Sequence, residues 1–383
     1  MIEFNKIESW YELTDFYRGK KGFKCEMSRE QHGILCGLLR DIKPKKILEI
    51  GVAEGGTTSV IMRCLSEMQL NSEVYSVDIS EILYYNKLLK TGYIYDEMNN
   101  DLKYSANHTF LLGDTIASYI EKIGAGIDFV ILDAMHTLPG EILDFLTVFP
   151  FCTSDAVFVI HDVNLNYYSA LSDEISRIRF SSENIATKLL FASIVADKYM
   201  NNVNDNIAVI RLNKDSRRYI DNIFYALTMN WSYMPTQNNL NEYMEIIRKY
   251  YAAKEMEILE KALQQNRVLM ERQSCLLNYM FPYEKVKNKR VVLYGAGKVG
   301  KELYSYFTIT QYCKIVGWLD KNFKDYDNKK YVVESPKELV NKEYDYILIS
   351  VLNYEVYEEI RQDILKIGNV DNEKIIGPLE YMW

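Results

Sequence analysis

Six short apolar segments constrain the fold of this chain more than any other feature of its sequence. Polar or glycine residues bound each segment, and stretches with helical spacing separate them. Continuous apolar runs are typical of strands buried on both faces of a parallel sheet, and helices normally connect such strands. We therefore predict a doubly wound, mostly parallel α/β sheet over roughly residues 28–215. The segments are KILEIGV (46–52), EVYSVDI (73–79), HTFLLGD (108–114), IDFVILDA (127–134), AVFVIHDV (156–163) and DNIAVIRL (205–212).

The same alternation restarts at residue 290 with RVVLYGAGKVGKELYSYF and continues through KIVGWLDKN, DYILISV and EKIIGP. This pattern predicts a second, smaller Rossmann-like α/β domain. Between the two domains, apolar residues at a 3,4 spacing indicate a helix that connects them through one buried face, and a homodimer contact is the alternative. The predicted division is an N-terminal helical or lid segment (1–27), a first domain (28–251), a helical linker (252–285) and a second domain (286–383).

Composition excludes several classes of partner. The 383 residues are 48% hydrophobic, which is enough for two buried cores, and the formal net charge of −8 argues against a nucleic-acid surface. The six cysteines are scattered without a CxxC pair, which favours reduced thiols. The start of the chain lacks a basic region followed by an apolar core, and no apolar run is long enough to span a membrane. We expect a cytoplasmic protein.

The first glycine-rich stretch, LEIGVAEGGTTS (48–59), follows a predicted strand directly. Gly51 and Gly55 would permit a tight turn and close approach of a ligand to the backbone, and Thr57 belongs to a hydroxyl run that can begin the next helix. Dinucleotides favour GxGxxG at such a turn, whereas S-adenosylmethionine tolerates the looser ExGxxxG that begins at Glu49. Both cofactor classes remain open on this stretch alone.

The ends of the next two strands add two acids. Asp78 ends EVYSVD, where either cofactor class uses a carboxylate for ribose hydroxyls. Asp114 follows the third strand and is suited to accept a hydrogen bond from an adenine amino group.

Taken in order, Glu49-Ile-Gly51, Asp78, Gly113-Asp114 and Asp133 resemble the successive motifs of class I S-adenosylmethionine-dependent methyltransferases. The resemblance covers roughly residues 28–215. It implies that Glu49 faces the cofactor's ammonium, directly or through water, and that the glycines bring the backbone close to its amino-acid end. The implied cofactor-binding residues are Glu49, Gly51, Gly55, Thr57, Asp78 and Asp114.

Two acid and imidazole pairs follow the fourth and fifth strands, Asp133-Ala-Met-His136 and His161-Asp162. The carboxyl ends of the strands border the ligand crevice of an open α/β sheet, so we expect both pairs to converge there. Methyl transfer to a hydroxyl needs a base, and imidazole suits that role near neutral pH. A divalent cation between Asp133 and Asp162 would orient and acidify the hydroxyl.

These pairs resemble those of the metal-dependent sugar O-methyltransferases of the macrocin and cephalosporin-tailoring type. The resemblance implies Asp133 and Asp162 as Mg²⁺ ligands and His136 as general base. His161 stands where some relatives carry Glu. We count His161 among the catalytic candidates, and orientation of a loop by hydrogen bonding is its alternative role.

The second glycine-rich stretch, YGAGKVG, carries the full dinucleotide spacing: Gly295, Gly297 and Gly300, with Asp320 at the end of the next strand. It resembles the small nucleotide-sugar or NAD-like modules attached to bacterial sugar-modifying enzymes. A bound nucleotide or nucleotide-sugar, bound NAD, and a packing or dimerisation role are the three interpretations.

The leading hypothesis is an S-adenosylmethionine-dependent O-methyltransferase that acts on a sugar or nucleotide-sugar hydroxyl, in bacterial polysaccharide or secondary-metabolite biosynthesis. One alternative is an NAD(P)-dependent oxidoreductase that uses the second glycine loop. A non-catalytic nucleotide-sensing scaffold is the other.

Overall fold

A computed structural model of the chain describes residues 7–83, 86, 88–98, 107–170, 184–200, 206–273, 281–326, 332–367 and 370–378. The chain divides into two compact units, Met1–Asn266 and Arg267–Trp383, and the boundary falls inside the predicted linker. Each unit contains its own sheet.

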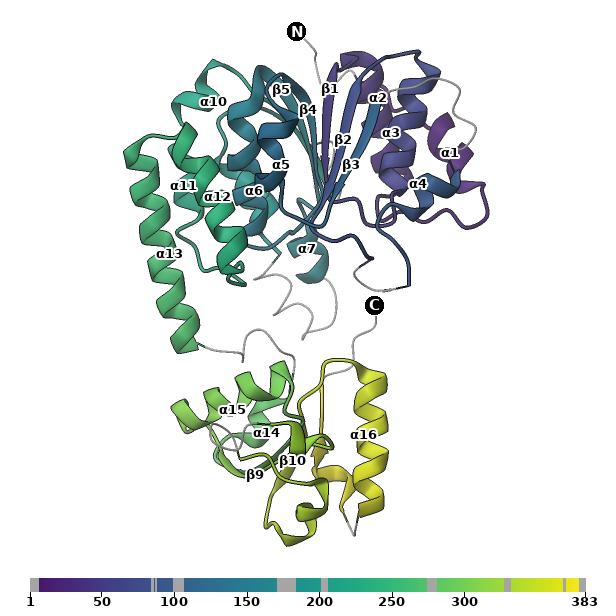
Figure 1. Cartoon of the computed structure of the whole chain (residues 1–383). Helices are drawn as coiled ribbons and strands as arrows, with labels where there is room; N and C mark the ends of the chain where they lie inside the picture. The colour runs from purple at the N-terminus through teal and green to yellow at the C-terminus, as the bar shows by residue number, and fades with distance from the viewer. Residues whose placement is uncertain are drawn as a thin grey trace. The chain divides into compact units, whose positions relative to one another are not determined.

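The first unit contains a seven-stranded sheet with the order β3-β2-β1-β4-β5-β7-β6 (Figure 1). All six apolar segments form strands of this sheet, as predicted. Strand β7 differs in direction: it pairs antiparallel with β5, and the short strand β6, which no apolar run announced, pairs antiparallel with β7. The strands are Lys46–Ile50 (β1), Glu73–Asp78 (β2), Asn107–Leu112 (β3), Ile127–Leu132 (β4), Cys152–His161 (β5), Asp197–Tyr199 (β6) and Ile207–Arg211 (β7).

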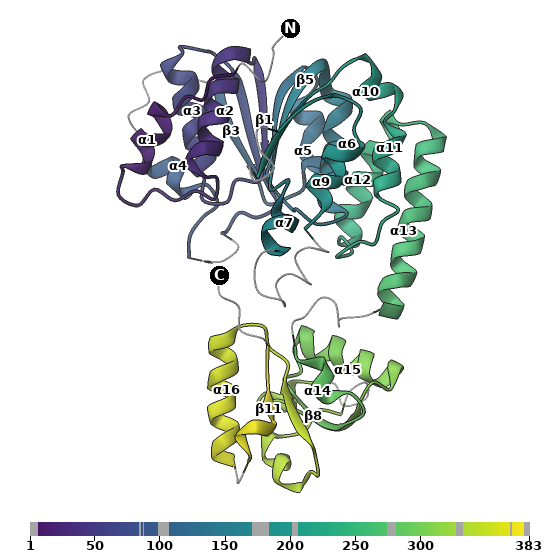
Figure 2. The same ribbon diagram turned by 180° about the vertical axis from the view of Figure 1, so that it is seen from behind.

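Helices cover both faces of the sheet, because the strands are apolar on both sides (Figures 1 and 2). One face is covered by Glu12–Arg18 (α1), Arg29–Ile42 (α2), Gly56–Glu67 (α3) and Tyr93–Met98 (α4). The opposite face is covered by Ile116–Ile123 (α5), Gly140–Val148 (α6), Ala186–Ser193 (α9), Asp221–Ala226 (α11) and Gln237–Tyr250 (α12). Three short elements complete this unit: Phe149–Phe151 (η2, a 3-10 turn), Leu165–Ala170 (α7) and Lys214–Arg218 (α10).

The described part of the N-terminal segment belongs to the core of the first unit. Leu13, Tyr17 and Met27 are buried and join the same hydrophobic cluster as strands β1 and β4. Ser28 begins α2 with a capping box, in which its hydroxyl accepts the Gln31 amide N–H while the Gln31 side chain accepts the Ser28 N–H.

The predicted linker helix is α13 (Ala253–Gln273), and residues 274–280 lie outside the described chain. Leu259 and Ala262 are fully buried on one face, as a connecting helix requires. Asn266 interrupts the apolar spacing because its side chain is buried in hydrogen bonds: it accepts the Trp231 N–H at 2.7 Å and donates to the Met229 carbonyl at 3.2 Å. Trp231 itself is a core residue.

The second unit contains a four-stranded parallel sheet with the order β11-β10-β8-β9. Hydrophobic clusters lie on both sides of it, one around Trp318 and one around Tyr357. Its strands are Arg290–Tyr294 (β8), Lys314–Leu319 (β9), Tyr346–Ile349 (β10) and Ile375–Ile376 (β11). Its helices and 3-10 turns are Tyr283–Val286 (α14), Lys298–Thr310 (α15), Phe323–Asp325 (η3), Pro336–Asn341 (η4), Tyr354–Ile367 (α16) and Asn372–Lys374 (η5).

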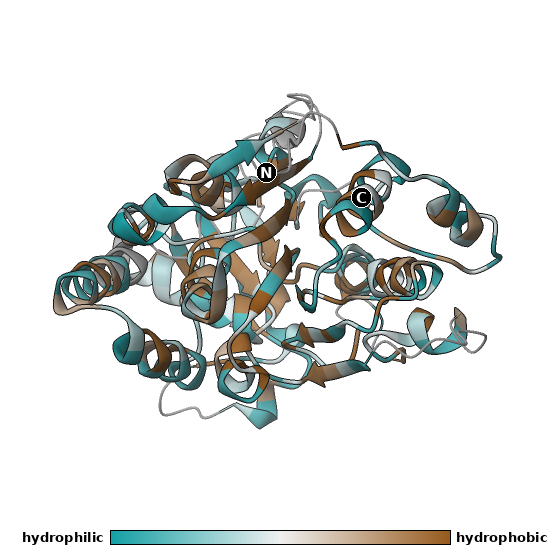
Figure 3. Ribbon diagram, turned by 90° about the horizontal axis from the view of Figure 1, so that it is seen from above, coloured by the Kyte–Doolittle hydropathy of each residue, from teal (hydrophilic) through white to brown (hydrophobic). Residues whose placement is uncertain are grey.

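Hydropathy follows this layering. Strands at the centre of the view in Figure 3 are coloured mainly as hydrophobic, and many helices carry hydrophilic residues. Within the described residues, no helix combines the length and apolarity needed to cross a bilayer.

Candidate active site

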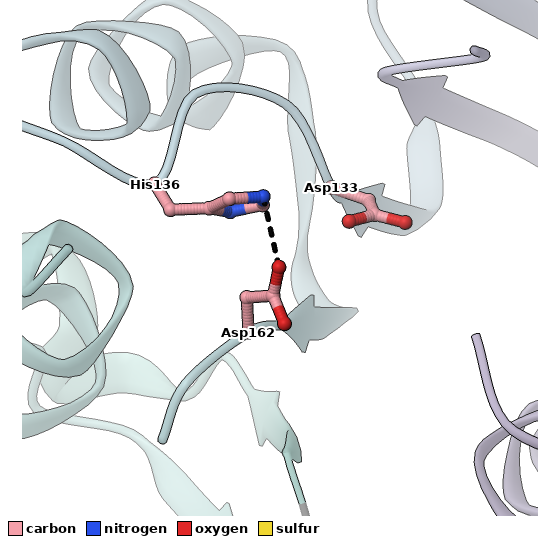
Figure 4. Close-up of side chains that lie close together, drawn as sticks. All are labelled: Asp133, His136 and Asp162. Atoms are coloured by element: carbon pink, nitrogen blue, oxygen red, sulfur yellow. Dashed lines mark ion pairs between the residues drawn. The ribbon is translucent and has the colours of Figure 1, made fainter. Parts of the chain in front are cut away.

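The loops after β4 and β5 bring Asp133, His136 and Asp162 together at the carboxyl edge of the first sheet (Figure 4). One ligand atom from each of the three side chains lies within 4.8 Å of the others. Asp162 has a φ of +55°, a left-handed backbone that turns the chain immediately after the strand. The predicted convergence of the two strand ends is therefore present in the structure.

Two short imidazole–carboxylate contacts join the loop after β4 to the loop after β5. His136 Nε2 lies 2.9 Å from Asp162 Oδ2, and His161 Nδ1 lies 2.7 Å from Asp133 Oδ1. Each imidazole therefore contacts the carboxylate of the other loop, which ties the loops after β4 and β5 to one another. Cross-pairing of this kind was not predicted from the sequence.

His161 is held on both sides by oxygen acceptors. Its Nε2 lies 3.2 Å from Gln31 Oε1, which also accepts the Ser28 N–H, so the capping box of α2 fixes the ring. A ring that faces two acceptors donates from both nitrogens, and this is the imidazolium form. Burial opposes that charge, but the charge and hydrogen bond of Asp133 outweigh it and raise the pKa of His161 to about 9. This geometry favours the orienting role for His161 over a catalytic one.

His136 and Asp162 form the second pair. Burial opposes protonation of His136, but the hydrogen bond and charge of Asp162, with smaller contributions from Glu141 and Asp133, raise its pKa to about 10. Burial likewise opposes ionisation of Asp162, and its contacts with the two imidazoles more than offset this and lower its pKa. The pair is therefore an ion pair at neutral pH.

Side chains from other segments fix Asp162. The Asn206 amide donates to Asp162 Oδ1, and the Thr187 hydroxyl donates to the Asp162 carbonyl at 2.9 Å. The backbone N–H of Ala186 donates to the His136 carbonyl at 3.1 Å. The start of α9 therefore contacts both loops of the site.

Glu141, which the sequence reasoning missed, lies in the first turn of α6 and is fully buried. Neither of its carboxylate oxygens has a hydrogen-bond partner in the described chain, and the Nδ1 atom of His136 is also buried without one. Burial raises the pKa of Glu141 to about 8, against the opposing charge of His136. No motif marks it, because a Glu in an apolar helix start is normally a solvated residue.

The donor set fits a divalent cation. Asp133 and Asp162 supply hard oxygen ligands, as Mg²⁺ prefers, and the nitrogen of His136 is a ligand better suited to transition metals. Asp133 Oδ1 is occupied by His161, which leaves Oδ2 as the available atom. Both oxygens of Asp162 have partners, Oδ2 with His136 and Oδ1 with Asn206, so a cation at Asp162 would take the place of one of them. Asp133 and Asp162 are thus the residues that would hold the metal.

A small pocket beside this cluster is lined by the first glycine loop together with Cys25, Glu26 and Asp133. Gly51 has a φ of +92°, and a Cβ atom there would lie 1.9 Å from the Asp133 carbonyl oxygen. A Cβ atom at Gly55 would lie 2.9 Å from Gly92 Cα. These glycines thus pack the loop against other backbone, and the pocket opens beside them.

Glu49 and Asp78, which the sequence analysis also assigned to the cofactor, differ in how they relate to this pocket. Glu49 is fully buried and lies outside the pocket lining: its Oε2 accepts the hydroxyls of Thr58 and Ser76, at 2.7 and 2.6 Å, and its Oε1 has no partner in the described chain. Burial raises the pKa of Glu49 to about 7. Asp78 Oδ2 accepts the N–H groups of Val52 and Ala53, at 3.0 and 3.2 Å, and so holds the glycine loop itself.

Asp114 and Thr57 complete the predicted set. The Asp114 carboxylate, two residues beyond the end of β3, accepts the Thr115 N–H at 2.8 Å. Thr57 lines the pocket and lies 3.3 Å from both Cys25 Sγ and His32 Nε2. Burial raises the pKa of the Cys25 thiol to about 12 and lowers that of His32 to about 3, so this triad is neutral.

In the second unit, the three glycines have distinct surroundings. A Cβ atom at Gly295 would lie 2.8 Å from Ser350 Oγ, and one at Gly300 would lie 2.0 Å from the Gly295 carbonyl oxygen, whereas one at Gly297 would face open space. Asp320 Oδ2 accepts the Ala296 N–H at 2.6 Å.

Comparison with known families supports the first unit as a methyltransferase. Residues 48–163 match the family model described as a methyltransferase domain, and residues 287–376 match the model described as C2185-like, N-terminal. Residues 48–163 therefore match a methyltransferase domain, as predicted. No curated protein matches the chain significantly.

Several solved structures match about half of this chain at low similarity. Podospora anserina methyltransferase PaMTH1, bound to S-adenosylhomocysteine, has a TM-score of 0.41 and 14% identity over 55% of this chain and 92% of its own. A putative caffeoyl-CoA O-methyltransferase from Staphylococcus aureus has a TM-score of 0.39 and 13% identity over 52% and 90%. MycE, from the mycinamycin pathway, in complex with Mg, S-adenosylhomocysteine and mycinamycin VI, has a TM-score of 0.35 and 18% identity over 54% and 55%.

Proposed function

We propose that the first unit transfers the methyl group of S-adenosylmethionine to a hydroxyl of a sugar or nucleotide-sugar. One observation carries this proposal: Asp133 belongs both to the wall of the glycine-loop pocket and to the cluster with His136 and Asp162. A cofactor in the pocket and an acceptor hydroxyl at the cluster would then lie side by side, as in-line methyl transfer requires. The sugar class and the biosynthetic setting rest on the sequence resemblance.

The reaction moves a methyl group from the cofactor to the acceptor and a proton from the acceptor to a base. The acceptor oxygen forms a bond to the methyl carbon as the carbon–sulfur bond breaks and its electron pair returns to sulfur, while the hydroxyl proton passes to His136 in its neutral form. Asp162 then stabilises the imidazolium, and His161 holds Asp133 in place. A divalent cation at Asp133 and Asp162 would supply Lewis acidity at the hydroxyl.

The base role predicts a pH dependence. His136 accepts a proton only as the neutral imidazole, and its neighbours raise its pKa to about 10. We expect kcat/KM to rise with pH toward that value, and Mg²⁺ to move the rise to lower pH because the cation offsets the carboxylates that hold the proton. A pH–rate profile that is flat from pH 6 to 10, with and without Mg²⁺, contradicts His136 as the base.

Release of S-adenosylhomocysteine in the presence of free and nucleotide-linked sugars tests the proposal. We expect Asp162→Ala and Asp133→Ala to abolish release, and EDTA to do the same if the cation is required. Asp155→Ala is the matched control, because Asp155 is an exposed acid that pairs with Arg211 away from the cluster. Full release by Asp162→Ala would remove the cluster from the mechanism.

We further propose that the loop of the second unit binds a nucleotide or nucleotide-sugar, as its glycine spacing suggests. The open space at Gly297 supports close approach of a ligand to the backbone. Titration of the full chain with UDP-glucose, compared with a Gly297→Trp variant, tests this second role: binding that is lost in the variant supports it, and equal binding contradicts it.

A further inference from the structure

Lys188, on α9, holds its ammonium between two neutral amides. Its Nζ lies 3.3 Å from Asn164 Oδ1 and 3.3 Å from Asn166 Oδ1, and no carboxylate of the described chain lies within ion-pair distance of it. Amide oxygens orient a cation but do not neutralise its charge. The ammonium of Lys188 therefore has no ionic partner in the described chain, at a half-buried position.

Other half-buried lysines have a ring or a carboxylate as partner: Lys20 lies 4.3 Å from the Phe16 ring centroid, and Lys301 lies 5.4 Å from that of Tyr326. Lys342, whose side chain is 21% exposed, lies 2.7 Å from the Glu334 carboxylate. Partly buried ammonium groups normally find such a partner, because burial without one is unfavourable. Among the described residues Lys188 has no such partner, although acidic residues outnumber basic ones in the chain, 53 to 45.

The position of Lys188 is tied to the candidate active site through its neighbours. Thr187 donates to the Asp162 carbonyl, and Ala186 donates to the His136 carbonyl. Asn164 is buried, and its backbone N–H donates to Asn206 Oδ1 at 2.8 Å, while the Asn206 amide donates to Asp162. The ammonium is therefore held beside the acid cluster by two separate sets of contacts.

The negative charges of Asp133 and Asp162 affect which acceptors can bind near Lys188. An acceptor hydroxyl presented to Asp133 and Asp162 brings the rest of the acceptor close to two carboxylates. An anionic acceptor would be repelled there unless a fixed cation stands nearby, whereas a neutral sugar needs no such cation. Lys188, with the amides of Asn164 and Asn166 around it, provides the fixed cation.

We propose that Lys188 binds an anionic group of the acceptor, so that the substrate is a phosphorylated or a carboxylated sugar. The shared chemistry is a negatively charged oxygen group that receives charge-assisted hydrogen bonds from the ammonium. This inference rests on the proposed methyl transfer and specifies the acceptor class for that same site.

Calorimetric titration of the full chain, saturated with S-adenosylhomocysteine, tests the proposal with two probes. Glucose 6-phosphate represents the phosphorylated source, and glucuronate represents the carboxylated source. We expect one probe to bind, Lys188→Gln to weaken its binding about tenfold or more, and Lys188→Arg to restore most of it. Lys198→Gln is the matched control, because Lys198 lies on β6 and donates to the Ala192 carbonyl.

The outcomes separate the two proposals. If S-adenosylhomocysteine binds but neither probe does, or if Lys188→Gln binds the probe as tightly as the unaltered chain, the anion site is wrong and the methyl-transfer proposal stands. Probe binding that persists in Lys188→Gln belongs to another site, such as the glycine loop of the second unit. If S-adenosylhomocysteine itself fails to bind, both proposals fail. Thermal unfolding of Lys188→Gln verifies that the variant is folded.

Discussion

A Cβ atom added at Gly51 would overlap the backbone oxygen of Asp133, whereas one added at Gly297 would meet nothing within 4 Å. The two glycine loops therefore use glycine differently. In the first unit the glycines let one loop pack against another that carries the acid cluster. In the second unit Gly295 and Gly300 serve packing, and Gly297 leaves backbone accessible.

The strands before the two loops differ as well. Glu49 stands two residues before Gly51, and Leu293 stands two residues before Gly295; both side chains are fully buried. In the described chain, a carboxylate on the strand before the loop and a cluster of acids and imidazoles accompany only the first loop. A glycine-rich spacing thus indicates a tight strand-to-helix turn, and the side chains around the turn indicate what chemistry it can support.

The largest expected effect is that of Gly51→Ala. The left-handed backbone at this position is unfavourable for alanine by roughly 1–2 kcal/mol, and the contact at 1.9 Å from Asp133 forces the two loops apart. We expect the free energy of unfolding to fall by about 3–5 kcal/mol, measured by urea denaturation. A loss below about 1 kcal/mol would show that the loops are not packed as described.

Glu49→Gln tests the buried carboxylate before the first glycine loop through the pH dependence of the protein's stability. The folded pKa of Glu49 is raised to about 7 from 4.5, so folding favours its protonated form. The stability it contributes is fully present below pH 4.5 and is lost as pH rises to 7. We expect Glu49→Gln to match the unaltered chain at pH 4.5 and to exceed its stability by about 2–3 kcal/mol at pH 8. Parallel stability curves for the two proteins would contradict a buried carboxylate there.

Asp78→Ala and Asp320→Ala form a matched pair, because each carboxylate accepts N–H groups of its own glycine loop. Hydrogen bonds to charged groups contribute about 1.5–3 kcal/mol. We therefore expect each variant to lose about 2 kcal/mol of stability, Asp78→Ala in the first unit and Asp320→Ala in the second. Thermal unfolding followed by calorimetry checks this, and a variant with no loss would mean that its loop is held by other contacts.

The smallest expected effect is that of Gly297→Ala. Gly297 has a φ of −69°, which alanine adopts readily, and nothing obstructs a methyl group. We expect a change in stability within about 0.5 kcal/mol, measured as for Gly51→Ala. A loss comparable to that of Gly51→Ala would remove the contrast between the loops.

The strands of the first sheet and the convergence of Asp133, His136 and Asp162 were accessible from sequence, because apolar runs mark buried strands and parallel strands share a carboxyl edge. The direction of β7 was not, since an apolar run such as IAVIR has no polarity. Glu141 and Lys188 were also missed: each lies in a helix with no motif, and only the fold places it beside the site.

The cross-pairing of His161 with Asp133 was beyond the sequence for a related reason. Adjacent residues on one strand end, such as His161 and Asp162, suggest a local pair, and their contact at 3.7 Å is present, but each side chain makes its shorter contact with the loop after β4. The functional roles assigned to these residues remain predictions.

Calorimetric titration of S-adenosylhomocysteine tests the central claim most directly. We expect one site per chain, with affinity reduced at least tenfold by Asp78→Ala and unchanged by Asp320→Ala, because the cofactor belongs to the loop of the first unit. Absence of binding, or binding that Asp320→Ala removes and Asp78→Ala leaves intact, would contradict the assignment of methyl-donor binding to that loop.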